Sequence, residues 1–296
     1  MTHNFTMPFS GGQIDHAETQ RTSDEIKGFF NTPLARCLCF YDGMPALNDD
    51  GTLKSVHPTD LSQLGLNDPG PIFLGLDGKI PIFAASLTRA EDIADLDTFQ
   101  NMRALASQLS AQNLAVAGRA KSLLDWHINH RFCAKCGQAS QPAQGGIKRN
   151  CLNCETEHFP RVNPVVIMLI LSGDKVLLGR GIGWPEGWMS ALAGFVSPGE
   201  TLEETVVRET FEEVGITIAN PTYIFSQAWP FPSQLMMGVF CEAQNEDITL
   251  NKAELDEAAW YSKADVRAVF AKESELFRRP PRVTIAHQLL RRWLDS

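Results

Sequence analysis

The chain has 296 residues, a hydrophobic fraction of 44%, a charged fraction of 21% and a formal net charge of −9. This length suffices for two or three domains, and the composition is that of a globular protein rather than a disordered one. No apolar run reaches the roughly 18 residues of a membrane-spanning helix, and the N-terminus lacks the pattern of a signal peptide. The acidic balance argues against a general nucleic-acid binder, and we expect a cytoplasmic location.

The first 125 residues predict a mostly β domain. Residues 1–25 are polar and aperiodic, so we expect a loose arm. Short apolar runs follow from Leu34 to Leu87, separated by turn signals such as Asp68-Pro-Gly70, which is typical of strands. Residues 99–128 are rich in alanine and leucine with helical spacing. Because none of these residues carries recognisable chemistry, we interpret this part as a scaffold or a dimer contact.

Four of the seven cysteines form two Cys-x2-Cys pairs, Cys133–Cys136 and Cys151–Cys154. This spacing predicts a closed tetrahedral site in which four thiolates hold one Zn²⁺ ion. A closed site has no open position for catalysis, so its role is to fold a short segment that cannot bury a core of its own. Disulfides and a redox-active dithiol are the alternatives.

Beyond the cysteines, the chain alternates strand and helix patterns, which predicts an α/β sandwich. A Gly- and Trp-rich loop separates the second and third strands. The predicted strands are 165–171, 175–180, 191–195, 216–218, 222–225, 234–242 and 259–261, and two closing helices are predicted at 263–271 and 283–294.

One helix between these strands carries the strongest chemical signal. Thr201 followed by Glu204 is a capping box that predicts a helix beginning at Leu202, and Gly215 suits the left-handed position that ends it. The helical wheel places one apolar arc toward the core, formed by Val206, Val207, Thr210, Phe211 and Val214.

Three carboxylates occupy the neighbouring arc of this helix, because Glu209, Glu212 and Glu213 have the spacing i, i+3 and i+4. Like charges at these spacings destabilise a helix by a few tenths of a kcal/mol per pair. A bound cation reverses that sign, and Mg²⁺ or Mn²⁺ suits oxygen ligands. A solvated acidic face is the alternative interpretation.

Residues 194–216 resemble the Nudix box, G-x5-E-x7-R-E-U-x-E-E-x-G-U, at every charged position and every glycine. Thr210 occupies a position that is usually aliphatic. The segment Ser226-Gln-Ala-Trp-Pro-Phe-Pro-Ser-Gln-Leu-Met236 resembles the S-Q-P-W-P-F-P-x-S-L-M signature of NADH pyrophosphatases (NudC-type) of the Nudix superfamily, with Ala228 in place of a proline and Ser233-Gln234 in place of x-Ser.

The resemblance implies an N-terminal Nudix-like domain (1–129), a four-cysteine zinc ribbon (130–160) and a catalytic Nudix domain (161–296), assembled as a homodimer. It implies hydrolysis of the diphosphate of NAD(H) to nicotinamide mononucleotide and AMP with Mg²⁺ or Mn²⁺, and removal of NAD caps from RNA. The alternatives are a Nudix hydrolase of another nucleoside diphosphate derivative, such as ADP-ribose, and an RNA-binding module with a degenerate Nudix fold.

The resemblance also assigns residues to roles. The metal ligands would be Glu209, Glu213, Glu254 and the carbonyl of Ala193, and the general base would be one of Glu209, Glu212, Glu213 and Glu254. Glu200 and Arg208 would support these carboxylates. The substrate-binding residues would be Phe159, Phe195, Gln227, Ala228, Trp229, Pro230, Phe231, Pro232, Ser233, Gln234 and Ala286.

When the chain is divided into residues 1–125, 126–161 and 162–296, only the middle segment has a net positive charge, with five basic and two acidic side chains. This charge suggests that the ribbon steers NAD-capped RNA toward the metals. On that hypothesis, reversing the charges of Lys135, Lys148 and Arg149 slows RNA decapping and spares free NADH.

Overall fold

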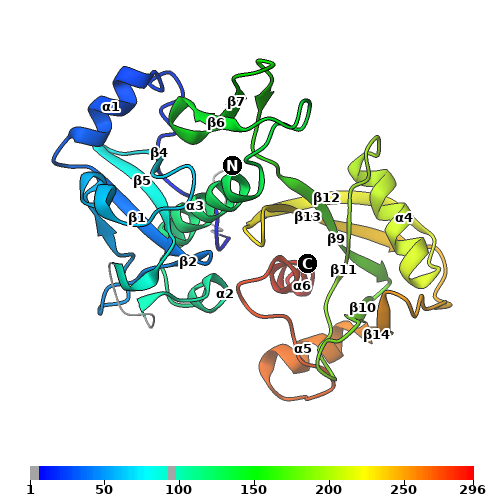
Figure 1. The fold of residues 1–296 in the computed structure, drawn as a ribbon. Coiled ribbons are helices and arrows are strands. Elements are labelled where there is room, and N and C mark those ends of the chain that lie inside the picture. The colour runs from blue at the N-terminus through cyan, green and yellow to red at the C-terminus, as the bar shows by residue number, and fades with distance from the viewer. Residues whose placement is uncertain (1–6, 93–97) are drawn as a thin grey trace. The chain divides into compact units, whose positions relative to one another are not determined.

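The computed structural model describes residues 7–92 and 98–296 (Figure 1). Its contacts divide the chain into two compact units. Unit 1 comprises residues 1–162 and 229–233, and unit 2 comprises residues 163–228 and 234–296. Each unit has its own sheet and its own apolar core. Among the described residues, no helix has the length and the apolar character needed to cross a membrane.

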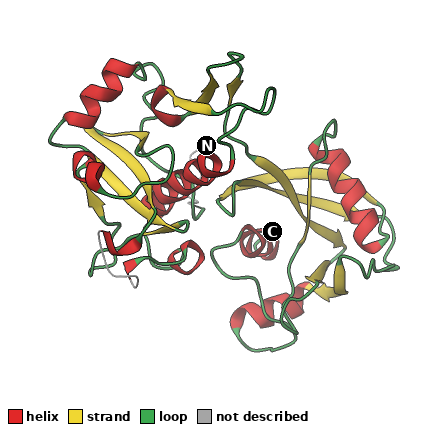
Figure 2. Ribbon diagram, viewed as in Figure 1, coloured by secondary structure: helices red, strands yellow, loops and turns green. Residues whose placement is uncertain are grey.

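Unit 1 contains the mostly β domain that the sequence predicts (Figure 2). Its sheet has the order β2-β1-β5-β4, with β3 paired to β1, and β1 runs parallel to β5. Phe73 and Phe83 lie in its core beside Leu61. The elements are α1 (Ser23–Asn31), β1 (Arg36–Tyr41), β2 (Met44–Pro45), β3 (Ser55–Val56), η1 (Pro58–Gln63), β4 (Ile72–Asp77), β5 (Ile80–Leu87), η2 (Ala90–Asp92), α2 (Met102–Leu105) and α3 (Ala111–Asn129).

The predicted loose arm is wrong for residues 7–25, whereas residues 1–6 lie outside the described part of the chain. Phe9 and Arg21 are each only 4% exposed. The Arg21 guanidinium donates hydrogen bonds to backbone carbonyls, among them that of Phe73 at 3.1 Å. Thr22 and Glu25 form a capping box that begins α1. The polar composition of this segment gives no indication that its residues bind groups far away in the sequence, such as the carbonyl of Phe73.

The cysteine segment folds into a small antiparallel sheet with the order β6-β7-β8. Gly145 and Gly146 lie at its tight turn with φ of 68° and 92°. A side chain at Gly146 would lie 2.6 Å from Ile72, so only glycine fits this close approach. The elements are β6 (Ser140–Ala143), η4 (Gln144–Gly146), β7 (Lys148–Cys151) and β8 (Glu157–His158).

Unit 2 contains a six-stranded mixed sheet with the order β12-β13-β9-β10-β14, in which β11 also pairs with β9. β13 runs parallel to β9, whereas β10 and β11 run antiparallel to it. The elements are β9 (Asn163–Ser172), β10 (Lys175–Gly181), β11 (Leu192–Phe195), α4 (Leu202–Val214), β12 (Ile218–Trp229), β13 (Gln234–Ala243), β14 (Leu255–Ser262), α5 (Lys263–Ala271) and α6 (Ile285–Leu294).

Helices cover both faces of this sheet, as the sandwich prediction requires (Figure 1). On one face, Val206 and Val214 of α4 pack in a cluster with Met168 of β9. On the other, a side chain at Gly238 of β13 would lie 2.8 Å from Leu289 of α6. Because β9 is buried from both sides, its sequence is a continuous apolar run rather than an alternating one.

Two details of unit 2 differ from the prediction. Strand β12 is continuous, where two short strands were expected, and it contains an irregularity at Asn220, which has a φ of 53°. In α4, Val207 and Phe211 are 45% and 58% exposed, so the predicted apolar arc is too wide. A helical wheel gives the spacing of side chains but not the centre of the buried face.

Candidate metal centres

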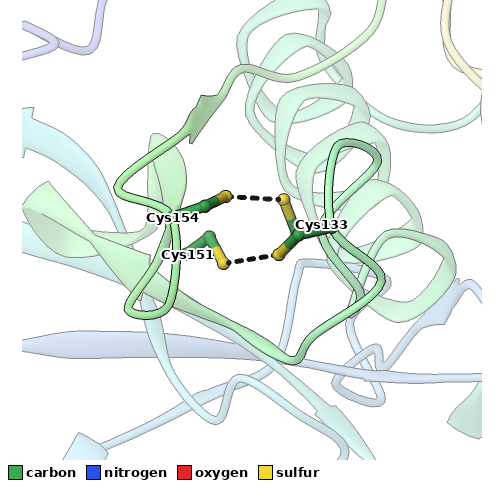
Figure 3. Close-up of side chains that lie close together, drawn as sticks. Cys133, Cys151 and Cys154 are labelled. Carbon is green, nitrogen blue, oxygen red and sulfur yellow. Dashed lines mark hydrogen bonds between the residues drawn. The ribbon is translucent and has the colours of Figure 1, made fainter.

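The four ribbon cysteines converge on one point (Figure 3). The sulfurs of Cys133 and Cys154 lie 3.6 Å apart, and those of Cys136 and Cys151 lie 3.5 Å apart. A disulfide requires about 2.05 Å, whereas a tetrahedral ion with Zn–S bonds of about 2.3 Å holds its sulfurs about 3.8 Å from one another. The donor set therefore fits one Zn²⁺ ion and excludes disulfides.

Neighbouring groups stabilise the charged form of the Cys154 thiol, whereas burial and contacts with the Cys136 and Cys154 thiols raise the pKa of Cys151 to about 11. The Thr156 hydroxyl lies 3.2 Å from the Cys154 sulfur and lowers the pKa of that thiol to about 6. The Nε2 atom of His158 lies 3.2 Å from the Cys133 sulfur. A thiolate is the form that binds metal, so these contacts favour an occupied site.

A buried network joins the ribbon to the rest of unit 1. The Arg149 side chain, 1% exposed, donates to His127 Nδ1 at 3.0 Å and to an Asp68 carboxylate oxygen at 2.9 Å. His127 Nε2 lies 2.7 Å from the Gly146 carbonyl oxygen, so Nε2 carries the proton and Nδ1 accepts. Burial lowers the pKa of His127 to about 4, which keeps the ring neutral.

Two of the three cations predicted to steer RNA are engaged within unit 1. Arg149 is buried and paired, and Lys148 forms an ion pair with Glu157 that leaves its side chain 13% exposed. Of the three cations, only Lys135 is exposed. Reversing the charge of Arg149 would break the buried network, so it cannot test RNA binding alone.

Removing one thiol should unfold the ribbon. We expect Cys151→Ser to lose its zinc and to lower the free energy of unfolding by about 3–5 kcal/mol, because the segment has little core without the ion. Metal analysis and thermal melting measure both effects. Cys241→Ser is the control, since Cys241 is buried in the core of unit 2 and should not change the zinc content. A folded, zinc-free Cys151→Ser protein contradicts the structural role.

The second candidate centre lies on α4, and residues close to one another in the sequence determine where this helix begins and ends. The Thr201 hydroxyl accepts from the Glu204 N–H at 3.2 Å, and the Glu204 carboxylate accepts from the Thr201 N–H at 2.7 Å. The helix begins at Leu202, as predicted, and Gly215 ends it with a φ of 70°. Both ends of the helix that carries the carboxylates are therefore set by local signals.

Carboxylate oxygens of Glu209, Glu213 and Glu254 lie within 4.8 Å of one another. Glu254 is far from α4 in sequence, and backbone hydrogen bonds bring it there. The Thr249 N–H donates to the Val214 carbonyl at 2.8 Å, and the Asn251 N–H donates to the Glu213 carbonyl at 2.9 Å. The segment that leads to Glu254 is thus fastened to the end of the helix.

The Glu209 carboxylate packs directly on the backbone of β11. A Cβ atom placed on Gly194 would lie 1.9 Å from Glu209 Cδ and 2.3 Å from both of its oxygens. No side chain fits in that space. The neighbouring residue Ala193, whose carbonyl is the predicted ligand, is exposed.

The charges of the cluster are poorly compensated within the described residues. Glu213 is 6% exposed, and its Oε2 atom is buried without a hydrogen-bond partner. Burial, with the charges of Glu209 and Glu254, raises the pKa of Glu213 to about 8. Burial also raises the pKa of Glu209. A divalent cation bound among these oxygens would satisfy the unpaired atom and offset the repulsion, so the donor set fits Mg²⁺ or Mn²⁺.

Arg208 organises the carboxylates around the cluster. Its guanidinium donates to both oxygens of Glu200, at 2.6 and 2.9 Å, and to Glu209 at 2.9 Å and Glu212 at 2.8 Å. The bond from Arg208 lowers the pKa of Glu200 to about 2. Glu212 therefore faces Arg208, whereas Glu209 reaches both Arg208 and the cluster.

Family comparisons match all three parts of the chain. Residues 161–280 match the NUDIX domain, residues 34–126 the NADH pyrophosphatase-like rudimentary NUDIX domain, and residues 128–159 the NADH pyrophosphatase zinc ribbon domain. The NAD-capped RNA hydrolase NudC of Chromobacterium violaceum is 33% identical over 257 residues, which cover 87% of this chain and 91% of that protein. The chain belongs to the NADH pyrophosphatase family of Nudix hydrolases.

Other members of the Nudix family are similar over part of their length. The human NAD-capped RNA hydrolase NUDT12 is 39% identical over 198 residues, which cover 63% of this chain and 43% of that protein. The chain thus spans less than half of that relative. The crystal structure of a NUDIX hydrolase from Nitrosomonas europaea superposes with a TM-score of 0.46 and 23% identity, covering 56% of this chain and 90% of that one.

Both predicted stacking rings are exposed: Phe159 precedes the Nudix domain, and Phe195 lies within the Nudix box. Phe159 is 65% exposed and Phe195 is 55% exposed, so neither is an ordinary core residue. The Phe195 carbonyl accepts a hydrogen bond from Arg208 at 3.1 Å. This bond ties the strand that enters the Nudix box to the arginine of the box.

The NADH pyrophosphatase signature segment divides between the two units. Gln227 is buried in unit 2, where its amide donates to the Val283 carbonyl at 2.8 Å. Trp229 and Phe231 belong to unit 1, where each packs edge-to-face on Phe9, at 5.9 and 5.7 Å between ring centroids. Phe9 is thus a contact of this segment that sequence reasoning missed.

The remaining residues predicted to bind substrate have mixed exposure. Pro230 is buried, Ala228 is exposed, and Ala286 is buried in the first turn of α6, whose N-cap is Thr284. The first N–H groups of a helix have no partner within it, so this turn suits a negatively charged group. Half-buried or exposed positions are occupied by Pro232, Ser233 and Gln234.

Proposed function

We propose that this protein hydrolyses the diphosphate of NAD(H) to nicotinamide mononucleotide and AMP, and removes NAD caps from RNA. The single observation that carries the proposal is the buried, unpartnered oxygen of Glu213 beside Glu209 and Glu254. The names of the relatives support the substrate, since one is an NAD-capped RNA hydrolase NudC and another, from mouse, is a mitochondrial NAD(P)H pyrophosphatase.

Mg²⁺ or Mn²⁺ would be held by Glu209, Glu213, Glu254 and the carbonyl of Ala193. Such an ion would supply positive charge against the diphosphate and would lower the pKa of a water bound to it. Arg208 holds Glu209 in place, and Glu200 in turn fixes Arg208 through its two hydrogen bonds. Positioning and electrostatic stabilisation by these fixed groups supply most of the rate in phosphoryl transfer.

A carboxylate of the cluster accepts the proton of the attacking water. Glu254 fits this role best, because it is exposed and forms no ion pair with any residue that the structure describes. Glu212 fits less well, since its carboxylate is engaged by Arg208 at 2.8 Å. Phe159 and Phe195 offer exposed ring faces for the bases of the substrate.

The same proposal includes the roles of the domains, further substrate contacts, the assembly and the location. Residues 1–129 act as scaffold, 130–160 as structural zinc ribbon and 161–296 as catalytic domain. The substrate is further contacted by residues 227–234 and by Ala286. The protein works as a homodimer in the cytoplasm, although relatives include mitochondrial and chloroplastic proteins.

Product analysis tests the activity. With NADH and Mg²⁺ or Mn²⁺, we expect AMP and reduced nicotinamide mononucleotide in equal amounts, and no products when divalent ions are omitted. Parallel reactions with NAD⁺ and ADP-ribose at equal concentration serve as comparisons. Intact NADH after prolonged incubation contradicts the proposal, and faster cleavage of ADP-ribose assigns the site to another nucleoside diphosphate derivative.

A further inference from the structure

The loop between β10 and β11 begins beside a candidate metal ligand. Gly181 pairs with Leu255, the residue after Glu254, and the Ile182 N–H donates to the Glu254 carbonyl at 3.4 Å. Ile182 is 53% exposed. A chemical group attached to a diphosphate that is bound at Glu209, Glu213 and Glu254 can therefore contact this loop.

The loop holds one indole ring in a fixed, accessible position. A Cβ atom on Gly181 would lie 3.2 Å from the Trp184 ring, so the indole lies against the backbone there, yet Trp184 remains 46% exposed. The Trp184 N–H donates to the Gly181 carbonyl at 3.1 Å. Asp256 also accepts from the Gly183 N–H at 3.3 Å and from Arg180 at 2.9 Å. An exposed aromatic ring on a braced loop is a platform on which a base can stack.

The far end of the same loop lines a hollow of about 730 Å³. Glu186 and Gly187 of the loop line it together with Val269 of α5 and the segment after that helix. The Arg278 N–H donates to the Gly187 carbonyl at 2.6 Å, which joins the loop to that segment. Gly187 is five positions after Ile182, so the chain between these two residues spans at most about 18 Å.

The charges of this hollow favour an anion. Lys272, Arg278 and Arg279 line it, and none of the three forms an ion pair with a residue in the described part of the chain. Two carboxylates, Glu186 and Glu275, also line it, which leaves one net positive charge. Arg279 also donates a hydrogen bond to the Phe270 carbonyl at 3.2 Å, so within the described part of the chain Lys272 and Arg278 are the cations of the hollow whose side chains form neither an ion pair nor a hydrogen bond. Guanidinium and ammonium groups bind phosphates well.

We propose that this loop and hollow bind the single-stranded RNA that follows an NAD cap. A base stacks on Trp184, and backbone phosphates lie in the hollow near Lys272 and Arg278. The inference rests on the proposed function. It places the RNA contacts in unit 2, because Lys148 and Arg149, two of the three cations predicted to steer RNA, form ion pairs within unit 1.

Charge reversal tests the proposal. For Lys272→Glu/Arg278→Glu we expect kcat/KM on NAD-capped RNA of about ten nucleotides to fall about 10- to 100-fold, with kcat/KM on NADH unchanged within about twofold. Arg292→Glu, an exposed charge reversal on α6 outside the hollow, is the matched control and should leave both values unchanged. Equal losses on both substrates, or no loss on either, overturn the proposal.

A binding measurement separates this inference from the proposed function. Fluorescence anisotropy with an uncapped single-stranded RNA of about ten nucleotides, without divalent ions, needs no turnover. For the native protein, log K for RNA binding should fall linearly with log [salt]. In the double variant we expect the slope of this plot to be shallower by about 1.4, because two phosphate contacts to a single strand are lost. Trp184→Ala should weaken binding, and Trp184→Phe should retain it. Unchanged RNA binding overturns the inference even if NADH is cleaved, whereas uncleaved NADH overturns only the proposed function.

Discussion

Replacing Glu213 with glutamine is expected to reduce NADH turnover by at least about 10²–10³-fold while the fold persists. Glutamine keeps the shape of the side chain but removes the negative charge that would hold the ion. The metal-free protein should not be destabilised, since Glu213 is 6% exposed and lies beside Glu209 and Glu254. Steady-state kinetics with Mg²⁺ or Mn²⁺ and thermal melting without them measure the two effects.

The pH dependence of stability provides an independent readout. The folded pKa of Glu213, about 8, is above its ordinary value of 4.5. The stabilisation linked to this proton is therefore fully present below about pH 4.5 and is lost as the pH rises toward 8, at no more than about 1.4 kcal/mol per pH unit. Without divalent ions, the native protein should lose stability over this range, and Glu213→Gln should lose less. Glu203→Gln, an exposed change on the same helix, is the control. Near-normal NADH cleavage by Glu213→Gln would falsify the metal assignment.

The parts of the fold that the sequence predicts well are those set by local contacts. Thr201 and Glu204 satisfy each other within one turn, so the start of α4 follows from four residues. Helix α5 has the predicted bounds, Lys263–Ala271, because Ser262 and Asp265 form the same kind of capping box. The paired spacings of the ribbon cysteines likewise specify one cluster of sulfurs.

Features that depend on contacts between residues far apart in the sequence could not be predicted from local sequence patterns. Glu254 could be assigned only through the family resemblance, because its approach to Glu213 depends on the backbone bonds of Thr249 and Asn251. Phe9 lies in a polar segment, and its burial depends on Trp229, more than two hundred residues later. The buried state of Arg149 is equally invisible in a segment whose sequence is basic.

Adding a single methyl group at Gly194 is expected to abolish activity as effectively as removing a ligand. In Gly194→Ala the new Cβ atom would lie 1.9 Å from Glu209 Cδ, so the Glu209 carboxylate must leave its place beside Ala193 and Glu213. We expect NADH turnover to fall by about 10²-fold or more, since a small misplacement of a catalytic group has an effect of that size. Titration with Mn²⁺ should show weaker binding, and zinc content should not change.

Two variants separate this steric effect from general destabilisation. Gly28→Ala is the matched control, because a Cβ atom there meets nothing within 4 Å and α1 should gain about 0.5–1 kcal/mol of stability. Gly194→Ala/Glu209→Ala removes the side chain that collides with the new methyl group, so its melting temperature should recover while turnover remains lost. A Gly194→Ala protein with normal turnover would show that the position of Glu209 against β11 does not matter for catalysis. If the double variant folds normally but remains inactive, glycine is needed at position 194 because it leaves room for the Glu209 carboxylate.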